Sequence, residues 1–353
     1  MFNPCMTSTL HHANRAYDFY RERNIGAAVE QFRLGAAAGE DPNEAALERW
    51  LSFMLAGDFE SAWQESDRVL CNRKRSGEDC THLPQHQRWL WDGTPLAGRN
   101  VMVRCFHGLG DTIQFIRFLP QLREICGEVS ILPQAELREL VPPMLAGVPE
   151  LEIELMEVPH ALRLTLDEIP ARVPYLQVAG SRPRNPAKFR VGLAWASGVW
   201  RPERSVPLEL FRFLNDIPDM ELVGLQRGPD ALQLSSGIPA CSPVFHEAEW
   251  WNDSIAETAR IIRSLDLVIS TDTMVAHLAG ALAVPVWTLL QWDADWRWLH
   301  SRDDSPWYPT MRLFRQQKPG YWAGVIARIE QALREQLAPS TPVRNDCAGL
   351  AVP

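Results

Sequence analysis

Residues 265–290 have the sequence LDLVISTDTMVAHLAGALAVPVWTLL. The apolar run LDLVI is typical of a buried strand, and MVAHLAGAL after it carries apolar residues on a helical period. No Lys, Arg, Asp or Glu occurs between Asp272 and Asp293, a stretch long enough to suggest a membrane span. His277 and Pro285 interrupt that stretch, so a helix followed by a buried strand fits it better. The segment therefore predicts a strand–helix–strand unit of a parallel α/β sheet.

The same alternation extends in both directions from this unit. Before it, strands are expected in VMVRCF (101–106), VSILP (129–133), FRVGLAWA (189–196) and ELVGLQ (221–226), and helices in TIQFIRFLPQLRE (112–124), AELRELVPPML (135–145), PLELFRFLND (207–216) and ETARIIRSL (257–265). A Pro-rich, basic segment, GSRPRNPAK (180–188), separates the two groups like an interdomain linker. Two Rossmann-like α/β lobes follow from this pattern, with a cleft between them and ligands at the carboxyl ends of the strands.

The first 90 residues are predicted to be helical, with a repeat. Ala16, Phe19, Asn24 and Ala28 recur 34 residues later as Trp50, Phe53, Asp58 and Ala62. A 34-residue period with small residues at packing positions resembles the tetratricopeptide repeat, and a plain helical bundle is the alternative. We expect four regions: helices over 1–90, an N-terminal lobe over 91–182, a C-terminal lobe over 183–338 and a flexible tail over 339–353.

Composition limits the class of protein. The 353 residues are 46% apolar and 22% charged, which excludes bulk disorder, and the net charge of −9 disfavours a nucleic-acid partner. Seven scattered cysteines form no CxxC pair, so neither a zinc site nor a disulfide framework is expected. The first ten residues do not resemble a signal peptide. We therefore expect a cytoplasmic protein without a transmembrane segment.

A glycine turn after the first strand of the N-terminal lobe carries the first candidate residue. Gly108 and Gly110 let the backbone turn sharply and leave room for a ligand, and Asp111 follows them. A dinucleotide fingerprint needs a third glycine where this chain has Ile113, so an NAD site is not expected. Asp111 is either a general base facing the cleft or a cap for the helix that it opens.

The second candidate is the start of the helix in the opening segment. Ser270, Thr271 and Thr273 bring hydroxyls to a place where free backbone N–H groups and the helix dipole favour an anion such as a diphosphate. Asp272 would repel a diphosphate, so we expect it to meet sugar hydroxyls or a basic partner. His277 lies on the same helix face as Thr273 and is either a core histidine or a catalytic group.

Arginines follow the strands of the C-terminal lobe. Arg201 and Arg204 come after FRVGLAWA, and Gln226 with Arg227 ends the next strand. Guanidinium groups bind phosphate in bidentate fashion, and the alternative is that both loop arginines are simply solvated. The tryptophan-rich run over 293–316 predicts either an aromatic wall over a sugar or base, or a buried aromatic lid.

Four segments occur in a telling order: HGLGDTIQFIRFLPQL (107–122), GLAWASGVWRPERSVPLELF (192–211), DLVISTDTMVAHLAGALAVPVW (266–287) and DWRWLHSRDDSPWYPTMRLFRQ (295–316). Together they resemble glycosyltransferase family 9, the group of the ADP-heptose:lipopolysaccharide heptosyltransferases. The resemblance covers about residues 88–335 and is greatest to bacterial proteins that fuse tetratricopeptide repeats to such a domain. It implies an inverting GT-B transferase that needs no metal and no cofactor beyond its nucleotide-diphosphate sugar.

Residue roles follow from the resemblance. Asp111 would be the base that deprotonates the acceptor hydroxyl, and the lobe that holds it would bind the acceptor through His107, Gly108, Gly110 and Gln114. The C-terminal lobe would bind the nucleotide sugar through Trp195, Arg201, Arg204, Gln226, Arg227, Ser270, Thr271, Asp272, Thr273 and His277. Arg204 stands where the family usually has a lysine. The acceptor would be a hydroxyl of a glycan, a lipopolysaccharide or a protein, steered by the N-terminal helices, and peripheral membrane association is compatible with it.

The chain also departs from the family's pattern. Gln291-Trp292-Asp293 replaces a glycine-proline-threonine turn, Val206 replaces a tryptophan, and His107 stands where repeat-fused relatives often carry glutamine. A rival hypothesis is therefore a non-catalytic scaffold, whose helices hold a protein partner while the body binds a nucleotide sugar without turnover.

Overall fold

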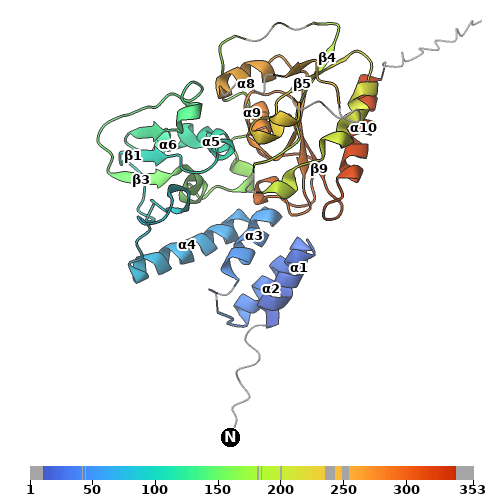
Figure 1. The fold of residues 1–353 in the computed structure, drawn as a ribbon. Helices are drawn as coiled ribbons and strands as arrows, with labels where there is room; N and C mark the ends of the chain where they lie inside the picture. Colours follow the sequence, from blue (N-terminus) through green and yellow to red (C-terminus); the bar gives the residue numbers. More distant parts are fainter. Residues whose placement is uncertain are drawn as a thin grey trace, which may run out of the picture.

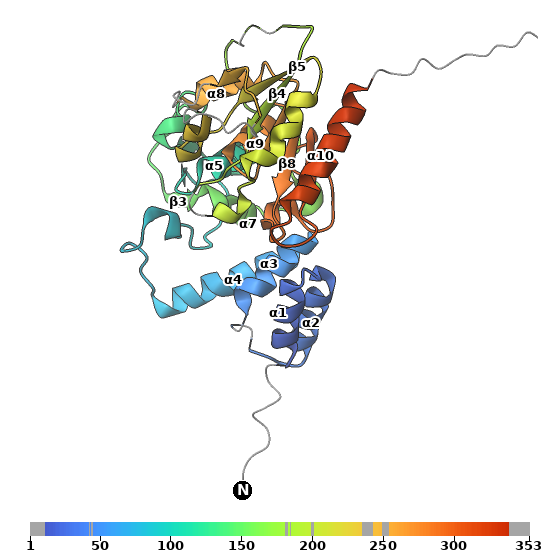
Figure 2. The same cartoon turned by 45° about the vertical axis from the view of Figure 1, so that its right-hand side comes forward.

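The computed structural model describes residues 11–41, 43, 45–180, 183, 185–198, 201–234, 243–248 and 254–338. Four helices lie together beneath two α/β lobes, and this arrangement is visible in both views (Figures 1 and 2). The expected fold class, an all-α region followed by two Rossmann-like lobes, is confirmed. The predicted tail over 339–353 lies outside the described residues, and the exact domain boundaries stay predictions.

The N-terminal region consists of two helix pairs. Its helices are α1 (His11–Arg21), α2 (Ile25–Ala37), α3 (Ala46–Ala56) and α4 (Phe59–Ser76). The second helix of each pair begins with the same cap, because Asn24 and Asp58 each accept a hydrogen bond from the backbone N–H three residues on. Ala28 and Ala62, also 34 residues apart in the sequence, are both fully buried where helices approach closely. The repeat spacing is thus matched by local structure, while the tetratricopeptide assignment stays a prediction.

The N-terminal lobe contains a three-stranded parallel sheet in the order β2-β1-β3. Its elements are β1 (Val101–Arg104), α5 (Leu109–Phe115), the 3₁₀ turn η2 (Ile116–Phe118), α6 (Leu119–Ile125), β2 (Val129–Leu132), β3 (Leu151–Glu154) and α7 (Val158–Ala161). Because β1 lies between β2 and β3, the turn after β1 sits where the chain switches direction across the sheet. This is where open parallel sheets bind ligands.

The C-terminal lobe contains a six-stranded parallel sheet in the order β6-β5-β4-β7-β8-β9. Its elements are β4 (Phe189–Ala194), η6 (Pro202–Arg204), η7 (Leu208–Asp216), β5 (Met220–Gly224), β6 (Glu247–Ala248), α8 (Ile255–Ile262), β7 (Leu267–Thr271), α9 (Met274–Ala281), β8 (Val286–Leu290), η9 (Trp296–Trp298), β9 (Met311–Arg315) and α10 (Trp322–Leu337). Counted within the lobe, this is the strand order 3-2-1-4-5-6 of dinucleotide-binding sheets. The switch point lies between β4 and β7, the strand quoted at the start of the sequence analysis.

Two predicted helices differ from the structure. The segment over 135–145 forms only a 3₁₀ turn, η3 (Ala135–Leu137), because Pro142 and Pro143 lack N–H donors and Pro142 restricts the residue before it. The segment over 207–216 is helical as predicted, but it winds as a 3₁₀ helix. Neither difference moves the edge of a sheet where ligands are expected.

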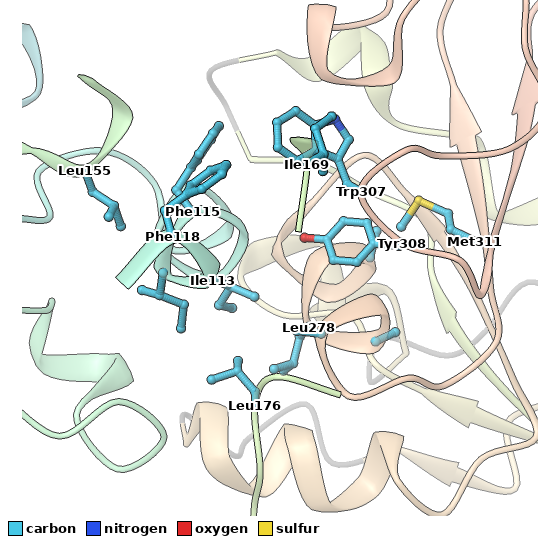
Figure 3. Packing of buried hydrophobic residues seen from close by; sticks show 14 of the residues in the cluster. Ile113, Phe115, Phe118, Leu155, Ile169, Leu176, Leu278, Trp307, Tyr308 and Met311 are labelled. Atoms are coloured by element: carbon cyan, nitrogen blue, oxygen red, sulfur yellow. The ribbon is translucent and has the colours of Figure 1, made fainter. Parts of the chain in front are cut away.

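A shared core joins the three regions. Figure 3 shows Phe115 and Phe118 of the N-terminal lobe facing Trp307 and Tyr308 of the C-terminal lobe, and all four are fully buried. Arg117 crosses the same contact, donating from Nη2 to Tyr175 Oη at 2.8 Å and from Nη1 to the carbonyl of Trp307. The lobes therefore meet through a packed interior below the cleft.

Candidate functional site

A cavity of about 590 Å³ opens between the lobes at the carboxyl ends of β1, β4 and β7. The N-terminal lobe lines it with Gly108, Leu109, Gly110 and Asp111. The C-terminal lobe lines it with Ala194, Ser197, Gly198, Arg201, Arg204, Leu225, Gln226, Arg227, Asp272, Thr273, Met274, Val275, His277, Asp295 and Arg297. Both switch points thus face one space, which is the position that the topology predicts for a ligand.

Asp111 occupies the first turn of α5 and faces this cavity. Its Oδ2 accepts a hydrogen bond of 2.9 Å from the backbone N–H of Gly108, so Asp111 does cap α5, while its role as a base stays a prediction. Its Oδ1 accepts a second one, of 2.7 Å, from Nη2 of Arg297. The side chain is still 28% exposed. A carboxylate is therefore held in a fixed orientation, with lone pairs left toward the cavity.

Arg297, which the sequence analysis did not single out, is the buried partner of that carboxylate. Its Nη1 donates to Asp295 Oδ1 at 2.7 Å, and its guanidinium lies 4.9 Å from the Trp296 ring centre and 5.4 Å from that of Phe115. Burial opposes its charge, but the neighbouring carboxylates of Asp295 and Asp111 outweigh burial and raise the pKa of Arg297. The only hint in the sequence was that Asp295 and Arg297 are charged residues inside the tryptophan-rich run over 293–316. Asp295 and Arg297 thus form the floor of the cavity.

The opposite wall is cationic. Nη1 of Arg204 lies 3.6 Å from Asp272 Oδ2 and donates to the Asp272 carbonyl at 3.3 Å, so Asp272 has the basic partner that the sequence suggested. Burial raises the pKa of Asp272, although Arg204 opposes the shift. Arg201 and Arg227 line the same wall, and Arg227 Nη1 donates to Thr258 Oγ1 at 3.1 Å. The arginines that were predicted to bind phosphate therefore converge on one space.

The first turn of α9 closes this wall, but not all of its predicted hydroxyls face the cavity. Thr273 is the residue before the helix and lines the cavity together with Met274. Ser270 and Thr271 are fully buried and belong to β7, and Ser270 Oγ donates to the carbonyl of Thr271 at 2.8 Å. An anion would therefore meet the backbone N–H groups of α9 rather than those two hydroxyls.

His277 is both a core residue and part of the cavity wall. Its Nδ1 lies 3.0 Å from Tyr308 Oη, and its ring stacks on Trp298 at 5.3 Å. Burial, with Arg297 and Arg117 nearby, lowers the pKa of His277 to about 3. A Cβ on Gly110 would lie 3.0 Å from His277 Cδ2, so this glycine lets α5 approach α9. The imidazole is neutral at physiological pH and serves as a fixed wall.

Four more residues that were predicted to bind the donor or the acceptor have structural contacts of their own. Gln226 lines the cavity, and its Oε1 accepts from the backbone N–H groups of Trp195 and Ala196, which fixes the loop after β4. Trp195 and Gln114 are buried and lie outside the cavity lining. His107 also lies outside it, with Nδ1 3.0 Å from the buried Glu154. Burial opposes its charge, but Glu154 outweighs burial and raises the pKa of His107.

The aromatic residues of the run over 293–316 pack in the interior and do not form an exposed wall over the cavity, which agrees with the second of the two alternatives. Trp298, Trp307 and Tyr308 are fully buried beneath the cavity.

Within the described residues, no three His, Cys, Asp or Glu side chains are grouped to hold a metal ion. No helix in the same set is long and apolar enough to cross a bilayer.

Comparisons with known proteins place this chain near one curated protein and several transferases. Protein FlbA of Caulobacter vibrioides is 25% identical over an alignment of 290 residues, and the match covers 69% of this chain and 48% of FlbA, so it spans about half of that relative. No family profile matches.

Among solved structures, the chain is similar to the family 9 glycosyltransferase of Veillonella parvula, with a TM-score of 0.48, 12% identity and 69% and 97% of the two chains covered. It is also similar to E. coli ADP-heptose lps heptosyltransferase II, with a TM-score of 0.44, 11% identity and coverage of 67% and 99%. For E. coli heptosyltransferase WaaC with ADP, the TM-score is 0.40, the identity 12% and the coverage 67% and 99%. These structures belong to the family that the sequence resembles.

Proposed function

We propose that this protein is an inverting glycosyltransferase that moves a sugar from a nucleotide-diphosphate donor to a hydroxyl group. One observation carries the proposal: a single cavity has an oriented carboxylate, Asp111, on one wall and the Arg204 guanidinium with the start of α9 on the other. A sugar transfer needs a proton acceptor near the nucleophile and positive charge near the leaving group. Asp111 would supply the proton acceptor and the Arg204 wall the positive charge, on opposite sides of the same cavity.

The proposed reaction uses these walls in one displacement. The acceptor oxygen attacks the anomeric carbon while its proton passes to the carboxylate of Asp111. The bond from that carbon to the diphosphate oxygen breaks, and the leaving diphosphate takes the bonding electrons. Attack from the side opposite the leaving group inverts the anomeric centre. Arg201, Arg204 and the first N–H groups of α9 would bind the diphosphate charge, so we propose that the transfer needs no metal ion.

The donor and acceptor classes come from the resemblance of the sequence. ADP-heptose is the first donor to test, because the four segments resemble those of the ADP-heptose-using family. The acceptor would be a hydroxyl of a glycan, a lipopolysaccharide or a protein, and the N-terminal helices would help to steer it. A cytoplasmic location stays a prediction.

A second function has one observation in its favour. Both oxygens of Asp111 already accept hydrogen bonds, one from the backbone of Gly108 and one from Arg297, so the carboxylate has structural partners without any substrate. The protein would then bind a nucleotide sugar without turnover, and its helices would hold a protein partner. Transfer activity separates this scaffold from the enzyme.

A thermal-shift panel tests the donor site first. The panel would hold ADP, UDP and GDP with their sugar conjugates, each without added metal. Binding to the folded state raises the unfolding midpoint by mass action, so we expect a shift with one nucleotide class. No shift with any nucleotide would overturn the proposed function. A shift without transfer to any acceptor would favour the scaffold.

A further inference from the structure

We infer that the N-terminal helices form part of the transfer site, with Trp50 and Arg23 acting as positioning residues for two different walls of the cleft. This inference rests on the proposed function and adds to it residues that never touch a substrate. Two separate contacts carry it, one through aromatic rings and one through charges.

The aromatic contact leads to Asp111. The ring of Trp50 in α3 packs edge-on against Trp296 at 5.7 Å, and Phe59 at the start of α4 does so at 6.4 Å. Trp296 in turn lies beneath the guanidinium of Arg297, which holds Oδ1 of Asp111. A shift of Trp296 would therefore move the group that orients the proposed base.

The charged contact leads to the opposite wall. Arg23, in the turn between α1 and α2, donates from Nη1 to Asp293 Oδ1 at 3.0 Å, and its side chain is only 5% exposed. The other oxygen of Asp293 lies 3.8 Å from Nη1 of Arg201, which lines the cavity. Asp293 thus sits between a buried arginine of the helices and an arginine of the cleft.

A backbone contact fixes the helices between these two points. The N–H of His300, just after η9, donates to the carbonyl of Leu55 in α3 at 2.8 Å. Leu55 and Phe59 belong to the same buried cluster as Phe115 and Trp307 of the lobes. The helices therefore share the interior on which the cleft is built, and cannot tilt without disturbing it.

This arrangement also explains a departure in the sequence. Gln291-Trp292-Asp293 replaces the turn that the heptosyltransferases carry after the last predicted strand of the opening segment. Asp293 of that turn is the residue that Arg23 contacts. The altered turn is thus the place where the helices reach the donor wall.

The two contacts predict different kinetic defects. Arg23 acts through Asp293 on Arg201, a proposed phosphate ligand, so its loss should weaken donor binding. Trp50 acts through Trp296 and Arg297 on the proposed base, so its loss should slow transfer after the donor has bound. A role in folding alone would predict neither pattern, because both constants per folded molecule would stay at the wild-type values.

The test measures the kcat for transfer, the KM for ADP-heptose and the calorimetric Kd of ADP in full-length variants. For Arg23→Gln we expect KM and Kd to rise roughly threefold to fivefold with kcat nearly unchanged, because the Asp293 side of the ion pair is 54% exposed and screened by solvent. For Trp50→Leu we expect kcat to fall about tenfold or more with Kd unchanged, since small misplacements of reacting groups are costly. Trp50→Phe should recover most of that kcat, because it restores an aromatic ring against Trp296.

Arg33→Gln is the matched control, because the Arg33–Asp58 ion pair lies within the helices and Arg33 is 57% exposed. It should leave kcat, KM and Kd unchanged. Wild-type values of all three constants in soluble, folded Arg23→Gln and Trp50→Leu would overturn the inference. If wild-type protein binds ADP but transfers nothing, the role of Trp50 is overturned together with the transfer reaction, and the Kd of ADP decides the role of Arg23. A wild-type protein that neither binds nor transfers would overturn the proposed function, and this inference with it.

Discussion

Arg297 and Asp111, 186 residues apart in the chain, share a hydrogen bond of 2.7 Å that joins the two lobes at the cavity. The bond fixes the orientation of the carboxylate, while Asp295 binds the guanidinium from the other side. A charge-assisted bond of this kind is stronger than a neutral one and keeps its geometry when the site is dry. The proposed base is thereby preorganised before any substrate binds.

Replacing Arg204 tests the cationic wall. Arg204→Gln should weaken the binding of a nucleoside diphosphate by about tenfold or more, since a hydrogen bond to a charged group contributes roughly 1.5–3 kcal/mol. Titration calorimetry with ADP measures the Kd directly. Arg212→Gln, an exposed arginine of the same lobe, is the control and should bind as the wild type does. Equal affinity in Arg204→Gln would remove this guanidinium from the donor site.

The buried histidine predicts a pH dependence of stability. His277 has its pKa lowered from 6.5 to about 3 in the folded protein, so between these values the unfolded chain binds a proton that the folded one does not. The free energy of unfolding should therefore fall as the pH drops below about 6.5, by about 1.4 kcal/mol for each pH unit from this group. Above pH 6.5 the group contributes no slope.

Urea unfolding at pH 7.5 and 5.5 checks this dependence. His277→Gln should lose less stability over that interval than the wild type, while His82→Gln, which changes an exposed histidine, should lose as much. A pH dependence in His277→Gln that equals the wild type would show that the imidazole is protonated in the folded protein.

Close packing under the cavity predicts the effect of an added methyl group. A Cβ on Gly280 in α9 would lie 2.4 Å from Cδ1 of the fully buried Tyr308 ring. Gly280→Ala should therefore destabilise the protein by about 1–3 kcal/mol, because the ring must shift within a filled core. Gly26→Ala in α2 is the matched control, since nothing lies within 4 Å of its added Cβ. It should stabilise the protein by about 0.5–1 kcal/mol; two equal denaturant midpoints would contradict the packing described.

The sequence predicted the fold because each β-rich run is short, apolar and followed by a turn and a helix. It failed over 135–145, where helical periodicity was given more weight than Pro142 and Pro143 inside the segment. The turn before α9 does line the cavity, but Ser270 and Thr271 are fully buried in β7, and anion binding by this turn stays a prediction. All five residues of β7 are buried because a parallel strand is covered on both faces, so neither of its two terminal hydroxyls reaches the cavity.

The sequence could not predict the pairing of Arg297 with Asp111. Nothing local in the run over 293–316 distinguishes Arg297 from Arg302, which pairs with the exposed Asp304 nearby. Arg297 differs from Arg302 only in the folded protein, where η9 packs against α5 and α3. Residues contributed by the loop between β8 and β9 become visible as part of a site only in three dimensions.

The most direct test of the account is the rate of sugar transfer by Asp111→Asn, measured together with its Kd for the donor nucleotide. Asparagine retains a side-chain oxygen that can accept from Gly108, so the cap survives while the base is lost. The account predicts that transfer falls by about a hundredfold or more, with Kd changed by less than threefold, since a positioned base contributes roughly 10²–10⁴ in rate. Asp167→Asn, an exposed residue of the same lobe, should transfer normally. Transfer by Asp111→Asn at the wild-type rate would show that Asp111 is only a helix cap, and would contradict the proposed mechanism.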